Sequence, residues 1–216
     1  MKEIIKRQSL AIGVFCFKNF PYLCQYNNSM KVIFLDNDGV VCLSSEWGGR
    51  SKKKSKYLKE FPGTESTMPA WVKMDNFNDK AVKVLNSILE QTDAEIVVSS
   101  DWKLYCTLDE LKEMFTKYGV VKQPIDVTPS IPLKYDKQYY TEGELAEYRI
   151  SEINMWLKEH PEVTQWVAVD DLPLGEIFGP ISGNFLGGLK NFVLTPKSSE
   201  GMKQCGIKEK ILKFLL

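Results

Sequence analysis

One stretch constrains this chain more than any other, because an uninterrupted apolar run leads directly into two carboxylates and a glycine: Lys31-Val-Ile-Phe-Leu-Asp36-Asn-Asp38-Gly39. Such a run is typical of a strand buried on both faces, as in a parallel sheet. Side chains alternate along a strand, so we expect Asp36 and Asp38 on one side and Asn37 on the other. Gly39 permits a sharp turn. The sequence therefore predicts two carboxylates just past a buried strand, where open α/β sheets bind ligands.

The same residues have a second interpretation. Asn37-Asp38-Gly39 between two apolar runs is also a strong signal for the turn of a β-hairpin. The choice between a parallel sheet and a hairpin therefore depends on the other strands of the chain.

Composition narrows the class of protein. The 216 residues suit one domain with a small insertion. The 28 basic and 28 acidic residues cancel, so binding to nucleic acid or an anionic membrane would need a local patch. No apolar run is long enough to cross a membrane. The sequence has a single histidine, His160, which excludes a zinc site with two histidine ligands.

The cysteines are odd in number and form no CxxC pair, which favours reduced thiols in a cytoplasmic protein over a disulfide framework. They are Cys16, Cys24, Cys42, Cys106 and Cys205. Residues 1–29 are interpreted as an N-terminal extension. Its run at 10–17 faintly resembles a signal peptide, but Lys18 ends that run and no small-residue cleavage site follows. We therefore place the domain at residues 30–216.

The stretch from 42 to 76 is expected to be an insertion after the first strand. It holds the basic run Arg50-Ser-Lys-Lys-Lys-Ser-Lys56 and the turn residues Pro62-Gly63. Such an insertion could be a small cap or flap over a site. A lysine run is more often a solvated loop, and that interpretation is preferred here.

Strands and helices alternate along the rest of the chain. The apolar patterns predict strands at 31–35, 95–98, 165–169 and 191–195, and helices at 79–90, 108–118, 144–159 and 208–216. Thr107 and Glu110 have the spacing of a capping box. Residues 123–140, rich in proline and tyrosine, are expected to be irregular. This alternation predicts a Rossmann-like, doubly wound parallel sheet.

Polar side chains follow three of these strands: Asp36 and Asp38, Ser99, and the pair Asp170-Asp171. The carboxyl ends of parallel strands share one edge, so these groups can meet. Two carboxylates 4 Å apart repel by about 4 kcal/mol at an effective dielectric near 20. A divalent cation removes most of that repulsion, and an all-oxygen site suits Mg²⁺.

Some of these residues have simpler interpretations. Ser99, Ser100 or Asp101 could cap a helix, and for the latter two that interpretation is preferred. Asp170-Asp171 before Leu-Pro could be turn residues. Trp102 and Trp166 are expected in the core or at its rim.

Taken together, the motifs resemble those of the haloacid dehalogenase (HAD) superfamily. The resemblance rests on Asp36-Asn-Asp38-Gly39-Val40, a serine after the strand at 96–98, and the acid pair after Val169. Three longer segments are similar to the HAD domain of Swiss-Army-knife RNA repair proteins: Val98-Ser-Ser-Asp-Trp102-Lys, Arg149-Ile-Ser-Glu-Ile-Asn-Met-Trp156-Leu and Trp166-Val-Ala-Val-Asp-Asp171.

The resemblance implies a role for each residue. Asp36 would be the nucleophile that forms an aspartyl-phosphate, and Asp38 the general acid and then base. Mg²⁺ would be held by Asp36, the backbone carbonyl of Asp38, and one or both of Asp170 and Asp171.

The resemblance also implies groups that bind the phosphate. Ser99 would donate a hydrogen bond to it, and Arg149 would grip two of its oxygens. The family more often has lysine at that basic position, so Lys103 is a second candidate. Arg149 could instead be an exposed helix residue.

Three functions follow from this reading. The first is an Mg²⁺-dependent phosphomonoester hydrolase that uses an aspartyl-phosphate. The second narrows the substrate to the phosphorylated end of a nucleic acid rather than a small molecule, with a loop at Lys52–Lys56 contacting backbone phosphates. The third is a non-catalytic module that binds phosphate or a partner. No membrane and no obligate protein partner are expected.

Overall fold

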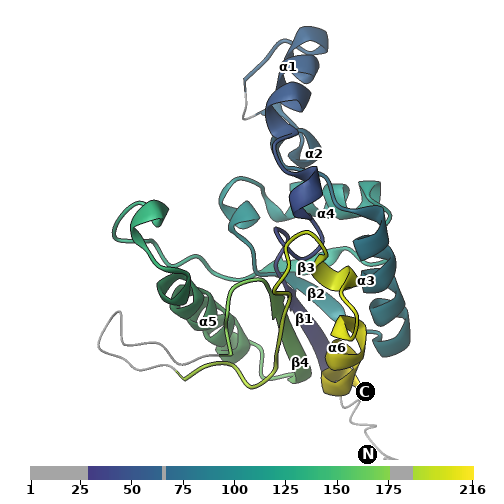
Figure 1. The fold of residues 1–216 in the computed structure, drawn as a ribbon, viewed down its shortest axis with the longest axis vertical. Coiled ribbons are helices and arrows are strands. Elements are labelled where there is room, and N and C mark those ends of the chain that lie inside the picture. The colour runs from purple at the N-terminus through teal and green to yellow at the C-terminus, as the bar shows by residue number, and fades with distance from the viewer. Residues whose placement is uncertain (1–28, 65–66, 176–186) are drawn as a thin grey trace, which may run out of the picture.

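The computed structural model describes residues 29–64, 67–175 and 187–216. Its centre is a sheet of five strands in the order β3-β2-β1-β4-β5, with every neighbouring pair parallel (Figure 1). The strands are β1 (Met30–Leu35), β2 (Glu95–Val98), β3 (Pro124–Val127), β4 (Val163–Asp170) and β5 (Phe192–Leu194). The predicted doubly wound α/β fold is confirmed, and the hairpin interpretation of Asn37-Asp38-Gly39 is wrong.

Helices cover both faces of the sheet, as Figure 1 shows. On one face lie α3 (Asp79–Thr92), α4 (Leu108–Lys117) and α6 (Ile207–Leu215), and on the other lies α5 (Glu142–Glu159). The alternation of side chains along β1 divides the core accordingly. Ile33 and Leu35 pack in the cluster with α3, α4 and α6, whereas Val32 and Phe34 pack with α5. Burial on both faces explains the continuous apolar run of this strand.

Local capping residues set the beginnings of three helices. The capping box of Thr107 and Glu110 is present at the start of α4. A second capping box, formed by Thr141 and Glu144, begins α5 two residues before its predicted start. Asn78 caps α3 by accepting hydrogen bonds from two backbone N–H groups.

Two predictions about irregular segments are wrong. The region 123–140 contains β3 at the sheet edge, where Pro124 and Asp126 leave no apolar run. The lysine run is a helix, α1 (Arg50–Glu60), followed by the short α2 (Ala70–Lys73). The described residues also include the 3-10 helices Ser44–Glu46, Asp101–Leu104, Lys137–Tyr139 and Gly201–Lys203.

Helices α1 and α2 lie at the end of the molecule opposite the C-terminus (Figure 1). Lys31, near the start of β1, donates a hydrogen bond from Nζ to the backbone oxygen of Leu215 at 2.8 Å. The C-terminus therefore marks the amino ends of the strands, and α1 projects beyond their carboxyl ends.

Residues 1–28, which make up nearly all of the expected N-terminal extension and include Cys16 and Cys24, lie outside the described residues. The described cysteines, Cys42, Cys106 and Cys205, are free thiols. Among the helices of the described ranges, none combines the length and apolar character needed to cross a membrane.

Candidate active site

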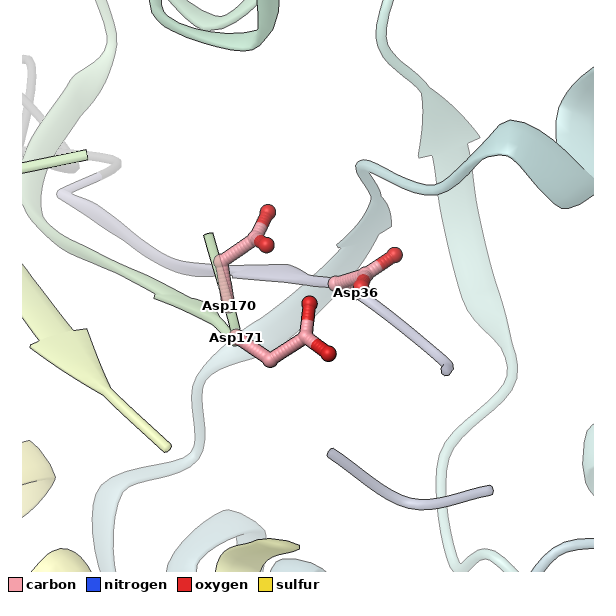
Figure 2. A group of neighbouring side chains, drawn as sticks. All are labelled: Asp36, Asp170 and Asp171. Atoms are coloured by element: carbon pink, nitrogen blue, oxygen red, sulfur yellow. The ribbon is translucent and has the colours of Figure 1, made fainter. Parts of the chain in front are cut away.

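Three carboxylates gather where β1 and β4 end, as Figure 2 shows. Asp36 follows β1, Asp170 is the last residue of β4, and Asp171 comes directly after it. Each offers one oxygen, and these oxygens lie within 4.8 Å of one another. Asp170 also acts as a turn residue, because its Oδ1 accepts a hydrogen bond from the backbone N–H of Leu172 at 2.9 Å. The convergence expected from parallel strand ends is therefore present.

Gly39 allows the loop after β1 to approach Asp171 closely. Its φ of +70° is in the left-handed region, and a Cβ added there would lie 2.2 Å from Asp171 Oδ2. The backbone N–H of Gly39 donates to the carbonyl of Cys42 at 2.8 Å, and the N–H of Cys42 donates to the carbonyl of Asn37 at 2.7 Å. The loop thus folds tightly back on itself, with Asn37 fully buried.

Arg149 reaches the acidic centre from α5. Its guanidinium lies 2.8 Å from Asp170 Oδ2, 3.2 Å from Asp36 Oδ1 and 3.2 Å from Asp101 Oδ1. It also donates to the backbone oxygen of Ser99. The residue is only 6% exposed, so the alternative of an exposed helix residue is wrong. Burial opposes its charge, but the adjacent carboxylates hold the pKa of Arg149 above its ordinary value.

The acids outnumber the cations in this centre. Burial raises the pKa of Asp36, although Arg149 and a hydrogen bond from Ser100 oppose that change. Burial and then the charge of Asp36 raise the pKa of Asp171 to about 7. Asp171 forms no ion pair with any described residue. Three clustered carboxylates with one guanidinium therefore fit a divalent cation, and the all-oxygen donor set suits Mg²⁺.

Asp38 occupies different surroundings and its carboxylate is not part of this group of three. Its side chain is 37% exposed and lies 3.8 Å from the guanidinium of Arg50. The indole N–H of Trp102 donates to Asp38 Oδ2 at 2.7 Å. Trp102 is buried, as expected, but it also orients this carboxylate. A buried indole N–H usually has a partner, which is the only signal that could have suggested this contact.

The residues after β2 contact the centre in three ways. Ser99 Oγ is buried and has no hydrogen-bond partner among the described residues, so its hydroxyl is available to a ligand. Ser100 acts to lower the pKa of Asp36, and it makes no capping hydrogen bond to the 3-10 helix that follows it. Asp101 pairs with Arg149 and, at 2.5 Å, with Lys137. The preferred capping interpretation of Ser100 and Asp101 is therefore wrong.

Lys103 is directed to a separate network. Its Nζ lies 2.6 Å from Glu152 Oε2, 2.8 Å from Thr128 Oγ1 and 3.1 Å from the backbone oxygen of Pro129. Of the two basic candidates, the structure brings Arg149 and not Lys103 into contact with the acids.

Arg50, the first residue of α1, was not expected near the site. Its Nε lies 2.6 Å from Asp75 Oδ2, and its backbone N–H donates to Asp75 Oδ1 at 3.2 Å. Asp75 is 2% exposed, so it is a buried anchor for the start of the helix. Nothing in the local sequence distinguishes Arg50 from the lysines that follow it, because the contact depends on how α1 packs.

Comparison with known proteins places the chain in a family. The sequence profile for the HAD domain in Swiss Army Knife RNA repair proteins matches residues 32–199. No curated protein and no solved structure matches the chain at a significant level. The matched range includes every residue of the acidic centre.

Proposed function

Because the chain belongs to the family of HAD domains in Swiss Army Knife RNA repair proteins, we propose that it is an Mg²⁺-dependent phosphomonoester hydrolase that works through an aspartyl-phosphate. One observation carries the proposal: the carboxylates of Asp36, Asp170 and Asp171 lie within 4.8 Å of one another at the ends of two strands. Carboxylates are brought together at such a distance when a cation balances them.

In the first step, Asp36 Oδ attacks the phosphorus and the bond to the leaving oxygen breaks. Asp38 gives its proton to that oxygen, so an alcohol leaves and the phosphoryl group stays on Asp36. Asp38 Oδ1 supports this role, because it has no hydrogen-bond partner among the described residues and can carry that proton.

In the second step, a water molecule attacks the phosphorus of the aspartyl-phosphate. Asp38 takes a proton from this water, the bond to Asp36 Oδ breaks, and inorganic phosphate is released. Asp38 is then protonated again, ready for the next substrate. The hydrogen bond from Trp102 holds its carboxylate in one orientation during both steps.

Asp36, Asp170, Asp171 and the backbone carbonyl of Asp38 would hold the cation. When bound, Mg²⁺ shields the repulsion between the Asp36 carboxylate and the anionic phosphate. Arg149 would hold phosphate oxygens, since its guanidinium already lies beside Asp36 and Asp170. The unpartnered hydroxyl of Ser99 would donate to a third oxygen.

Turnover of an aryl phosphate with and without Mg²⁺ tests this function, with Asp36→Asn as the key variant. We expect metal-dependent release of phosphate, and a loss on the order of 10⁴-fold or more in the variant. A chain that binds Mg²⁺ but releases no phosphate from any phosphomonoester is instead a non-catalytic phosphate-binding module. Normal activity of the Asp36→Asn variant would refute the role of Asp36 as the nucleophile.

A nucleic-acid end is the second, narrower candidate for the substrate. The description of the family favours it, because it names RNA repair proteins. The formal net charge of zero means that such a substrate must be attracted by a local basic surface. Comparable rates on a phosphorylated oligonucleotide and on sugar phosphates, with no effect of salt, would contradict it.

A further inference from the structure

Helix α1 has two faces of different character. On one face, Lys53 Nζ donates to the backbone oxygen of Trp71 at 2.9 Å and to Asn76 Oδ1 at 2.9 Å. Tyr57 packs edge-on against Trp71, with ring centroids 6.1 Å apart. This face holds α1 against α2 and the segment after it. The opposite face is therefore free to contact something else.

The opposite face, which we call the lysine face, consists of Ser51, Lys52, Ser55, Lys56 and Lys59. These residues are all exposed and together line a shallow groove. The spacing of the three lysines at i, i+4 and i+7 places them on one side of the helix. None of the three forms an ion pair with a described residue. Three adjacent cations without counter-charges repel one another, and a polyanion would relieve that repulsion.

Helix α1, which carries the lysine face, begins beside the proposed general acid. Arg50, directly before Ser51, lies 3.8 Å from Asp38 Oδ1 and is anchored by the buried Asp75. In the proposed reaction Asp38 protonates the leaving oxygen, so the leaving group lies on the Asp38 side of the centre. That side leads to α1. A long leaving group would therefore extend toward α1, which projects away from the sheet (Figure 1).

We propose that the lysine face of α1 binds the sugar-phosphate backbone of a single nucleic-acid strand whose terminal phosphate lies at Asp36. This inference rests on the proposed function. From Arg50 to Lys59 the helix extends about 14 Å, which is long enough to face a few successive phosphates of one strand. Serine hydroxyls between the lysines can donate to phosphate oxygens.

An exposed aromatic side chain shortly before α1 suits a single strand better than a duplex. Trp47, three residues before the helix begins, is 46% exposed. Unpaired bases stack on such side chains, whereas the bases of a duplex are already stacked. An anionic membrane is disfavoured, because a helix lying in a membrane surface needs an apolar face, and here the face with Tyr57 packs on α2.

The test compares two triple variants of the full chain that lose the same charge. Lys52→Ala, Lys56→Ala and Lys59→Ala remove the lysine face, and Lys83→Ala, Lys210→Ala and Lys213→Ala serve as the control on exposed positions of α3 and α6. Binding of a fluorescent 12-nucleotide single strand is measured by anisotropy at several salt concentrations. For the lysine-face variant we expect binding about tenfold or more weaker, and a salt slope reduced by about two. The control should change binding less than about twofold.

Further measurements distinguish a failure of the lysine-face proposal from a failure of the proposed phosphatase function. The triple Lys→Arg variant of the lysine face keeps the charge and should restore binding of the strand. Equal binding by the two alanine variants overturns the proposal, as does preferential binding of phosphatidylserine vesicles through the lysine face. If the protein releases no phosphate from an aryl phosphate, the proposed function fails. The anisotropy measurement still reports on the lysine face in that case, because it needs no turnover.

Discussion

Asp36 and Asp38 are two residues apart in the sequence, but their side chains differ in exposure and in the groups that they contact. The side chain of Asp36 is 7% exposed, and its carboxylate contacts a buried guanidinium from α5. The side chain of Asp38 is 37% exposed, and it contacts Arg50 at the start of the projecting α1. Strand alternation alone would put both on the same side in the same environment. The tight turn at Gly39 separates them, so one carboxylate is enclosed with the other acids while its neighbour remains open to a leaving group.

This comparison predicts different roles, and the Asp38→Asn variant tests the difference. We expect a loss of about 10² to 10⁴-fold for an alkyl phosphate, whose leaving oxygen needs a proton. For p-nitrophenyl phosphate the loss in formation of the aspartyl-phosphate should be much smaller, because that oxygen leaves unprotonated. Single-turnover kinetics on both substrates measure the contrast. Equal losses on both substrates would remove Asp38 as the general acid.

The enclosed surroundings of Asp36 depend on Arg149. Arg149→Met should destabilise the fold by about 3 to 5 kcal/mol, because buried carboxylates lose their cation. Lys103→Met is the matched control, since Lys103 is also buried and paired with a carboxylate, Glu152. Urea denaturation should show a comparable loss for both variants. Only Arg149→Met should weaken inhibition by inorganic phosphate, and the reverse result would make Lys103 the phosphate ligand.

The orientation of the more exposed carboxylate, that of Asp38, depends on Trp102. Trp102→Phe removes the hydrogen bond to Asp38 and should lower kcat by about tenfold or less, which corresponds to the roughly 1 kcal/mol of one hydrogen bond. Trp156→Phe is the control, because its indole N–H donates to Asp126 at 2.6 Å on the other face of the sheet. Both variants should lose similar stability. A similar loss of kcat in the control would mean that the effect is one of packing.

The smallest expected effect concerns the ion pair that joins α2 to α4. Lys73 in α2 lies 2.6 Å from Glu110 in α4. Partial burial acts to raise the pKa of Glu110, but hydrogen bonds from Lys73 and Thr107 outweigh it and lower that pKa. A carboxyl with a lowered folded pKa stabilises the fold above its ordinary value of about 4.3, and the stabilisation disappears as the pH falls through the lowered value.

Glu110→Gln should therefore reduce the free energy of unfolding at pH 7 by less than about 1 kcal/mol, because the pair is partly exposed. At a pH below the lowered pKa of Glu110 the variant and the parent should be equally stable. Thermal unfolding across this pH range measures the difference. A constant difference at all pH values would show that the ion pair is not its cause.

Local patterns predicted the elements that have an apolar run or a capping motif. Apolar runs identified β1, β2, β4 and β5, and the spacing of Thr107 and Glu110 identified the start of α4. They did not identify β3, because Pro124 and Asp126 leave it without an apolar run. They also predicted a loop for the lysine run. A helix forms there because Lys53 and Tyr57 pack against the segment containing Trp71. A pattern of neighbouring residues cannot reveal this contact, because the two segments are separated in the sequence.

The sequence by itself determined that acids follow the strands β1 and β4, and parallel pairing of neighbouring strands was enough to bring Asp36 to Asp170 and Asp171. Only the tertiary structure decided which cation joins them and what contacts Asp38. Arg149 is 21 residues from Asp170, and Trp102 is 64 residues from Asp38. Strand periodicity is a local property of the backbone, whereas these contacts depend on the packing of a helix and a loop over the sheet edge.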